Sequence, residues 1–350
     1  MSDNESDEEQ QQQMEEVSIC ADVWLEIFAF VSPLQLGHLM ALISDRFDVL
    51  VDEHFKLRKW SLSWLQIRRA TDGNSAQFVN RSGKQLPIPQ GPLPSKVIGF
   101  ERIWIRYIDQ PVIEFLQRIR RLFNSCGTNV WITTSDDQSR SWEIIWQKIC
   151  PFVNNNCCRF LLFRPSQLDN LRQFSPTVLR NCANLRMIDS VELFPAFPAE
   201  DNAGASSGQA MAKWLLTARE DGRPKMLCCR FYSEGMEELK WAFVNAIDPA
   251  NFFIRFWFYG EDDNFVPFEL KNNLTGERLT LRKMDEVNWM LVRCPIAREE
   301  AKWAEWEEET IQWKWIWWTR QRNRIVIDFK DSDIGDRKVK AKTGRMCLIA

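Results

Sequence analysis

The segment Asn129–Phe163, NVWITTSDDQSRSWEIIWQKICPFVNNNCCRFLLF, shows the pattern that governs most of the chain. Its two ends, Asn129–Thr134 and Cys158–Phe163, are short apolar runs of the length typical of buried strands. Between them, Trp142–Phe152 has the spacing of an amphipathic helix. The segment therefore predicts a strand, a helix and a second strand.

The same alternation continues on both sides of this segment. Further strands are expected at Glu101–Ile108, Arg186–Leu193, Lys225–Tyr232 and Phe252–Tyr259, and further helices at Val112–Phe123, Ser166–Cys182, Gln209–Thr217 and Met236–Ile247. The strand centres recur about every 28 residues, apart from one longer interval that contains the Pro/Ala/Gly/Ser-rich loop Pro195–Gly208. This period is typical of a leucine-rich-repeat-like solenoid or a related parallel α/β sheet. Because the consensus Leu and Asn spacing is poorly kept, we expect a degenerate repeat.

The C-terminal part of the chain has a different pattern. Period-two alternation on either side of Thr275–Glu277, within Pro267–Val292, predicts an antiparallel hairpin or meander that closes the end of the sheet. A last helix is expected over Ala297–Arg320, and a short strand over Ile325–Phe329. Five residues form one stripe of that helix, which predicts core packing: Trp303, Trp306, Thr310, Trp313 and Trp317. Two tryptophans lie off the stripe and are candidates for partner docking: Trp315 and Trp318.

The N-terminal part has a helical pattern of its own. Residues 1–16 carry seven acidic groups and no basic one, which predicts a disordered acidic tail. Three short amphipathic helices follow between Ile19 and Phe55, and a connecting helix is expected to extend to about Ala70. We therefore expect an α+β protein with an N-terminal helical module and linker helix (17–70), a Gly/Pro/Asn/Ser-rich loop (71–96), an α/β repeat-like domain (97–330) and a basic disordered tail (331–350).

Composition limits the class of partner. The chain has 350 residues and a net charge of −3, so the part beyond the acidic tail carries only +4. An excess this small argues against nucleic acid, which usually requires a concentrated basic face. No run reaches the ~18 apolar residues of a membrane helix, and the start lacks a secretory signal. We therefore expect a protein of the cytoplasm or nucleus whose cysteines are thiols.

The residues that catalysis or metal binding would need are scarce. The only histidines are His38 and His54, and the adjacent pairs Cys157-Cys158 and Cys228-Cys229 do not have the Cys-x-x-Cys spacing of a zinc site. Gly83-Lys84 lacks the other residues of a phosphate loop. We therefore expect a binding protein without catalytic residues, metal or cofactor, and regard an enzyme of unusual type as a third alternative.

Two N-terminal stretches, Ile19–Phe28 (ICADVWLEIF) and Ser44–Val51 (SDRFDVLV), resemble the F-box, and the match covers about residues 18–55. More broadly, the chain resembles the F-box proteins of plant-parasitic nematodes, in short stretches that begin at Val23, Phe47, Gly208 and Asp333. This resemblance implies that the module binds a Skp-type adaptor and, through it, a cullin and a ubiquitin-conjugating enzyme. It places these residues on the adaptor-facing side: Ile19, Val23, Trp24, Ile27, Phe28, Leu34 and Leu36.

The resemblance therefore implies a substrate-recognition subunit of an SCF-type ubiquitin ligase, active in ubiquitin-dependent protein degradation. Its α/β domain would bind an unknown target protein. One departure supports an alternative, because the family usually begins with Leu-Pro where this chain has Ile19-Cys20. That alternative is a non-ligase interaction scaffold that uses the solenoid and the Trp-rich helix. From spacing alone, the module could also be a helical hairpin packed on the rest of the chain.

The last four residues, Cys347–Ala350, fit the prenylation pattern of Cys, two aliphatic residues and a terminal residue of the farnesyl type. Five basic residues precede them: Arg337, Lys338, Lys340, Lys342 and Arg345. A prenyl chain together with a polybasic segment supplies the two signals that stable membrane anchoring needs. Cys347 is therefore a candidate for prenylation, which would bring the protein to a membrane surface.

Overall fold

The computed structural model describes residues 19–31, 36, 40–57, 59–73, 75–93, 95–123, 127–230, 233–257, 266–312 and 323–335. The chain divides into two compact units, and the division falls between Trp60 and Ser61. The N-terminal unit contains α1 (Ala21–Phe28) and α3 (Asp45–Leu57). Between these helices only residues 29–31, 36 and 40–44 are described, so the expected three-helix module is not evident in this part of the structure.

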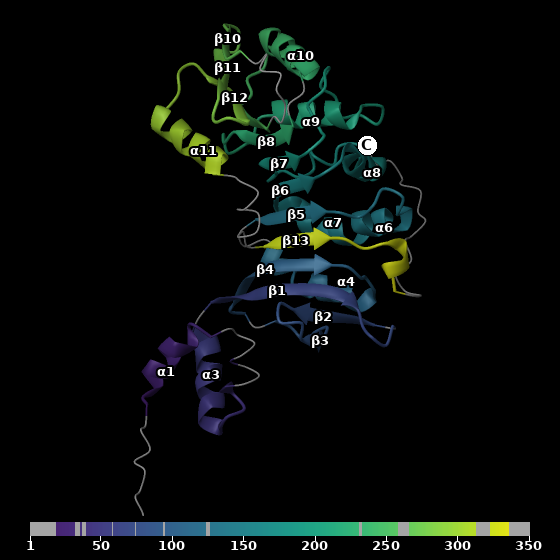
Figure 1. Ribbon diagram of the computed structural model, residues 1–350, viewed down its shortest axis with the longest axis vertical. Coiled ribbons are helices and arrows are strands. Elements are labelled where there is room, and N and C mark those ends of the chain that lie inside the picture. Colours follow the sequence, from purple (N-terminus) through teal and green to yellow (C-terminus); the bar gives the residue numbers. More distant parts are fainter. Residues whose placement is uncertain are drawn as a thin grey trace, which may run out of the picture. The chain divides into compact units, whose positions relative to one another are not determined.

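The larger unit is a mixed α/β structure built on one sheet of thirteen strands, in the order β10-β11-β12-β9-β8-β7-β6-β5-β13-β4-β1-β2-β3 (Figure 1). The strands are β1 (Trp60–Arg69), β2 (Ala76–Asn80), β3 (Gln85–Pro87), β4 (Val97–Ile105), β5 (Thr128–Ile132), β6 (Cys157–Leu162), β7 (Met187–Ser190), β8 (Lys225–Arg230), β9 (Phe252–Trp257), β10 (Phe268–Asn272), β11 (Glu277–Lys283), β12 (Asn288–Pro295) and β13 (Arg324–Ile327).

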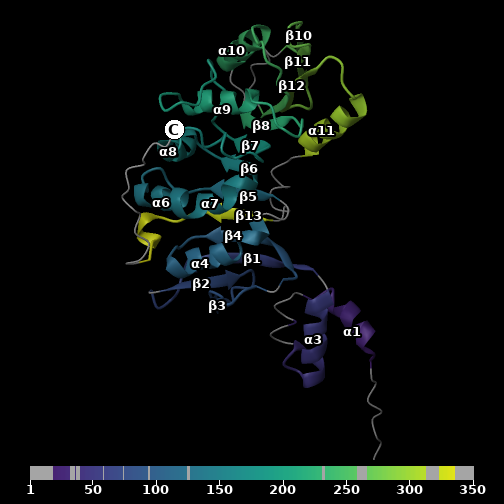
Figure 2. The same ribbon diagram turned by 180° about the vertical axis from the view of Figure 1, so that it is seen from behind.

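The middle of the sheet is parallel and follows the chain from β5 to β9. The helices of this unit are α4 (Gln110–Arg118), α5 (Arg120–Phe123), α6 (Ser139–Ile144), α7 (Cys150–Val153), α8 (Pro165–Phe174), α9 (Ser207–Leu216), α10 (Ser233–Val244) and α11 (Glu300–Gln312). In both views α4, α6, α8 and α9 lie on one side of the strands and α11 on the other (Figures 1 and 2). The predicted alternation of strands and helices is therefore confirmed in the described residues between 101 and 257.

One predicted helix in this region is too long. The sequence predicts a helix over Ser166–Cys182, but α8 ends at Phe174 and turns follow it. Ser175 has extended backbone angles, with φ −149° and ψ 103°. It precedes Pro176, whose ring disfavours the helical conformation at the residue before it.

The two ends of the sheet are antiparallel. At one end, β10, β11 and β12 form the predicted meander, which pairs with β9 through β12. At the other end, β1 pairs with β2 and β2 with β3, where the sequence predicts a helix up to Ala70 and a loop over 71–96. Both of those predictions are wrong. The apolar residues Trp60, Leu62 and Trp64 alternate with serines, which is the period of a strand and not of a helix.

Strand β13 lies inside the sheet, where it pairs in parallel with both β4 and β5. Ile325 and Ile327 on this strand are fully buried. Just before the strand, Asn323 accepts a hydrogen bond at Oδ1 from the backbone N–H of Phe100 at 2.9 Å. Asn323 has a φ of 54°, a left-handed conformation that asparagine tolerates better than most residues. The last described strand therefore completes the centre of the sheet.

This insertion and the antiparallel ends correct the predicted architecture. The expected degenerate leucine-rich-repeat-like solenoid is not evident in the described residues, because β13 separates β4 from β5 and the strands do not stack as uniform repeats. The larger unit also begins at Ser61 and includes β1 to β3, whereas the sequence predicts a domain that begins at residue 97. The 28-residue period predicts the parallel strands. It does not predict the strands β1 to β3 at one end of the sheet or the position of β13 between β4 and β5.

Helix α11 covers the face of the sheet opposite α9. Trp303 and Trp306 are buried in a cluster with Met187, Met226 and Phe253, and Thr310 is also buried. The prediction that this stripe packs into the core is therefore confirmed for these three members. Trp313 and Trp317 lie outside the described residues, as do the docking candidates Trp315 and Trp318. Among the described helices, none has the length and apolar character needed to cross a membrane.

Candidate functional site

Helix α1 carries apolar side chains on two sides. Trp24 is half-buried and Phe28 is fully buried, one helical turn apart. On another side, Val23 and Ile27 are 44% and 39% exposed and are also one turn apart. Asp22 and Glu26 occupy a third side and are exposed. A helix that is apolar on two sides can bury only one of them against its own unit.

The inner side of α1 packs on α3. Phe28, Leu36 and Val51 form the buried core of the unit, with exposed fractions of 0%, 1% and 2%. The Trp24 ring lies edge-on to Phe47, with centroids 4.7 Å apart, and Phe28 lies edge-on to His54 at 5.8 Å. These aromatic pairs add to the energy gained from burial alone. The inner side of α1 is therefore already used within the N-terminal unit.

Hydrogen bonds fix the ends of the two helices. The Arg46 guanidinium of α3 donates from Nη2 to the carbonyl oxygen of Ile19 at 2.5 Å. Ser44 accepts a long hydrogen bond at Oγ from the N–H of Phe47, at 3.4 Å, as expected for a residue that caps α3. Cys20 stands at the N-cap of α1 and makes no side-chain cap. The start of α1 is thus held by a contact from α3.

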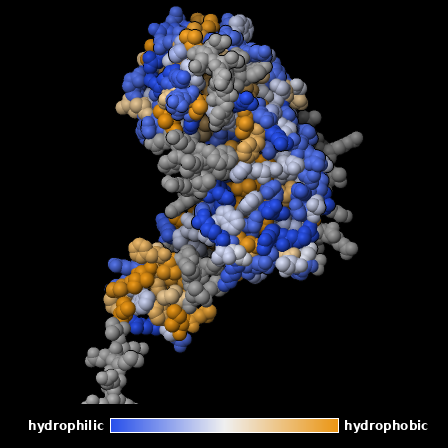
Figure 3. Space-filling model, in the orientation of Figure 1, coloured by the Kyte–Doolittle hydropathy of each residue, from blue (hydrophilic) through white to orange (hydrophobic). Residues whose placement is uncertain are grey.

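The N-terminal unit exposes large apolar side chains on both of its described helices and beside them. We call these residues together the outer surface, and its members are Ile19, Val23, Ile27, Phe30, Leu42, Ile43, Val49 and Leu57. Phe30 and Leu42 are 92% and 78% exposed. Apolar residues colour much of the visible face of this unit (Figure 3). Contiguous apolar surface of this kind typically marks an interaction site.

The structure separates the predicted adaptor-facing residues into two groups. Ile19, Val23 and Ile27 lie on the outer surface, whereas Trp24, Phe28 and Leu36 contribute to the internal core. Leu34 and Cys347 lie outside the described residues. Five exposed apolar residues were not among the sequence candidates: Phe30, Leu42, Ile43, Val49 and Leu57. Phe30 follows Val23 and Ile27 at helical spacing, so the sequence did contain a signal for it.

The larger unit has a smaller exposed apolar area at the end of α10. We call it the α10 patch, and its members are Trp241, Val244, Ile247 and Leu274. Asn272 links these residues, because its amide donates to the carbonyl oxygen of Phe243 at 2.8 Å and its Oδ1 accepts from the N–H of Leu274 at 2.9 Å. The turn after β10 is thereby held against the C-terminus of α10.

The cysteine pairs of β6 and β8 belong to the interior of the sheet. Cys157, Cys228 and Cys229 are buried, as expected for core residues. Burial raises the pKa of the Cys228 thiol to about 12, so this side chain is protonated at neutral pH. In the described ranges no three His, Cys, Asp or Glu side chains come together as a metal site.

Comparison of the chain with protein-family models, with curated proteins and with solved structures gives no match.

Proposed function

We propose that this protein is a substrate-recognition subunit of an SCF-type ubiquitin ligase, in which the N-terminal unit binds a Skp-type adaptor through its outer surface. The observation that carries the proposal is the second apolar side of α1, which Val23 and Ile27 leave exposed although Trp24 and Phe28 already fill the core of the unit. The F-box resemblance of residues 18–55 supports the choice of partner.

The energetics favour a protein partner for this surface. A Val, Leu, Ile or Phe side chain contributes about 1.5 to 3 kcal/mol when it is fully buried. The outer surface has eight such side chains, all at least 36% exposed. Part of the gain from burying them would be offset by the entropy lost on association. The side chains that the partner covers would therefore supply most of the affinity of the complex.

The larger unit would bind the target protein in this proposal. The α10 patch supports that role, because Trp241 and Leu274 are 69% and 79% exposed. Tryptophan is among the residues that most often dominate the energy of protein interfaces. The alternative function is a non-ligase scaffold, which would use the same patch but would not bind the adaptor. The start of α1 favours this alternative, because Cys20 at the N-cap makes no side-chain hydrogen bond to the helix.

A double substitution on the outer surface tests the proposal. Val23→Glu with Ile27→Glu is expected to abolish formation of a one-to-one complex with a purified Skp-type adaptor, because it would place two carboxylates in an apolar interface. Both side chains are exposed, so the helical signal and the unfolding temperature are expected to stay close to those of the wild type. The complex is measured by size-exclusion chromatography with light scattering.

Trp241→Glu is the matched control, since it places the same charge on an exposed apolar site of the larger unit. This variant should bind the adaptor as the wild type does. If the wild-type protein fails to bind the adaptor, or if the double variant binds it equally well, the assignment is wrong. Failure of the wild type would favour the scaffold.

A further inference from the structure

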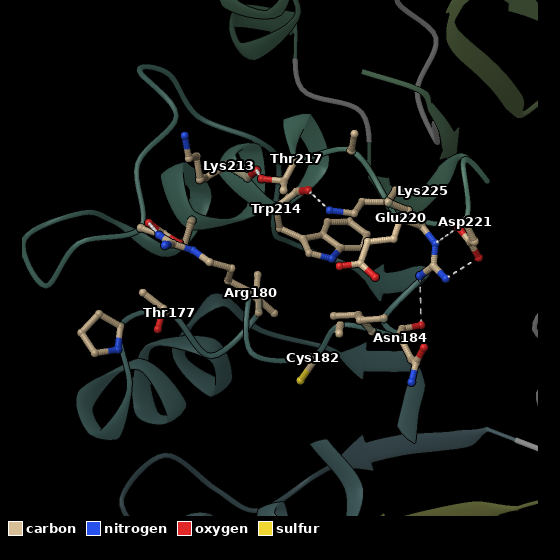
Figure 4. Close-up of a pocket in the computed structure, with 18 residues that line it drawn as sticks. Thr177, Arg180, Cys182, Asn184, Lys213, Trp214, Thr217, Glu220, Asp221 and Lys225 are labelled. Atoms are coloured by element: carbon tan, nitrogen blue, oxygen red, sulfur yellow. Dashed lines mark hydrogen bonds and ion pairs between the residues drawn. The ribbon is translucent and has the colours of Figure 1, made fainter. Parts of the chain in front are cut away.

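A cavity of about 310 Å³ lies at the amino end of β8 (Figure 4). It is lined by the segment 176–185, by α9 and by the loop that leads from α9 into β8. Trp214 of α9 and Lys225, the first residue of β8, both line it. The volume lies at the lower end of the range for small-molecule sites. A peptide segment would need more room, so any ligand here is small.

Lys225 places a buried amine in this cavity. Lys225 is only 6% exposed, and its Nζ donates to the backbone carbonyl oxygen of Trp214. The same nitrogen lies 5.1 Å from the centroid of the Trp214 ring. No ion pair among the described residues joins this amine to a carboxylate. Burial, with a smaller contribution from Arg219, lowers the pKa of Lys225 to about 7.

Trp214 supplies a second buried donor. The residue is 4% exposed, and its indole Nε1 has no hydrogen-bond partner in the described part of the chain. A buried N–H that gives up water without gaining an acceptor is unfavourable. Two buried donors without an acidic partner therefore line one small cavity, which suits a ligand that brings acceptors and negative charge.

The other charged groups around the cavity do not neutralise Lys225. Arg180 donates from Nε to Asp201 at 2.9 Å, and Arg219 forms an ion pair with Asp221 at 2.8 Å, so these four charges compensate one another. Lys213 and Glu220 are exposed. The charged groups that line the cavity besides Lys225 are Arg180, Asp201, Lys213, Arg219, Glu220 and Asp221.

We propose that this cavity binds a small organic carboxylate. The carboxylate accepts hydrogen bonds from Lys225 Nζ and Trp214 Nε1, and the apolar part of the ligand lies against Leu179, Leu185 and Ala210, which also line the cavity. The proposal concerns the larger unit alone and does not depend on adaptor binding.

Binding should depend on pH in a defined direction. A bound anion favours the protonated amine, whereas in the empty cavity the amine loses its proton near pH 7. Below pH 7 the amine is already charged, so affinity is constant. Above pH 7 each binding event must take up a proton, and the dissociation constant is expected to rise roughly tenfold per pH unit.

Isothermal titration of the full chain with benzoate tests the proposal. At pH 8.5, titrations in two buffers of different ionisation enthalpy should show uptake of about one proton per benzoate bound by the wild type. Lys225→Met should abolish benzoate binding, and Trp214→Phe, which keeps a ring but removes the N–H, should weaken it severalfold. Benzyl alcohol, which has the same ring without the charge, should not bind.

Two controls separate recognition from folding. Lys225→Met should be at least as stable as the wild type at pH 7, because it removes the cost of a buried amine, and the difference should shrink as the pH rises towards 10.5. Glu220→Gln should tighten benzoate binding, since it removes an exposed negative charge from the lining. Benzoate binding that survives in Lys225→Met, binding without proton uptake, or binding of inorganic phosphate but not of millimolar benzoate would overturn the assignment.

Discussion

Replacing Phe28 with alanine is expected to unfold the N-terminal unit while the thirteen-stranded sheet stays folded. Phe28 is fully buried, and its ring lies 6.1 Å from that of Trp24, 6.4 Å from Phe47 and 5.8 Å from His54. A Phe→Ala substitution in a packed core typically costs about 3 to 5 kcal/mol. A unit of this small size has little more stability than that to lose.

Hydrogen exchange by mass spectrometry measures this effect separately for each unit. Amides of α1 and α3 should lose their protection in Phe28→Ala, whereas those of β5 to β9 should keep it, because the two units are compact in their own right. Val23→Ala, five residues earlier on the outer side of the same helix, should change the stability of the unit by only about 0.5 kcal/mol. Retained protection of α3 in Phe28→Ala would show that the inner cluster does not hold the unit together.

Substitutions at Phe28 and on the outer surface are expected to act on different properties of the unit. Phe28→Ala would remove adaptor binding by unfolding the unit, so that result could not identify an interface. Val23 and Ile27 lie on the outer surface, so their substitution tests recognition with the fold intact.

The strands that could be predicted from the sequence are those whose signal is local. Each strand from β4 to β9 overlaps a predicted apolar run, because buried strands need a short, nearly continuous stretch of apolar residues. The position of β13 had no such signal. The apolar run Ile325–Phe329 predicts a short strand, but the partners of β13 in β4 and β5 are about 200 residues away in the chain. Pairing between strands this far apart in the sequence depends on how the whole sheet packs, and a local pattern of residues does not show it.

The errors at the other end of the sheet have a different cause. The Gly, Pro and Asn residues of 71–96 indicate a loop, yet they form the turns around the short strands β2 and β3. Gly83, with a φ of 81°, makes the turn between these two strands. Composition identified the turns but not the five-residue strand Ala76–Asn80 between them.

For the candidate site, helical spacing identified the apolar residues of α1 but not their direction. Trp24 and Val23 are neighbours in sequence, and either side of the helix could have faced the core. The contact of Trp24 with Phe47 of α3 decides which side is internal. The packing of α1 on α3 therefore decides which of its two apolar sides is exposed, and the spacing of the residues in α1 does not.

A buried ion pair holds the meander to the rest of the sheet. Glu277 of β11 and Arg293 of β12 are 1% and 2% exposed and form an ion pair of 2.6 Å between Glu277 Oε2 and Arg293 Nη2. Glu277 Oε1 also accepts from the N–H of Ala250 at 2.9 Å, just before β9, and Arg293 Nη2 donates to the carbonyl oxygen of Asp248 at 2.9 Å. These contacts join β11 and β12 to the segment that leads into β9.

Glu277→Gln is therefore expected to destabilise the larger unit strongly. The amide keeps the shape of the side chain but leaves the guanidinium of Arg293 as an uncompensated buried charge, and breaking one side of a buried pair costs about 3 to 5 kcal/mol. Urea unfolding, followed by tryptophan fluorescence, measures the loss. Glu269→Gln is the matched control, because Glu269 forms only an exposed pair with Lys271 and should contribute less than about 1 kcal/mol. Equal stabilities of the two variants would contradict a structural role for the buried pair. Addition of Arg293→Met to Glu277→Gln should recover part of the loss, because the double variant no longer buries a lone charge.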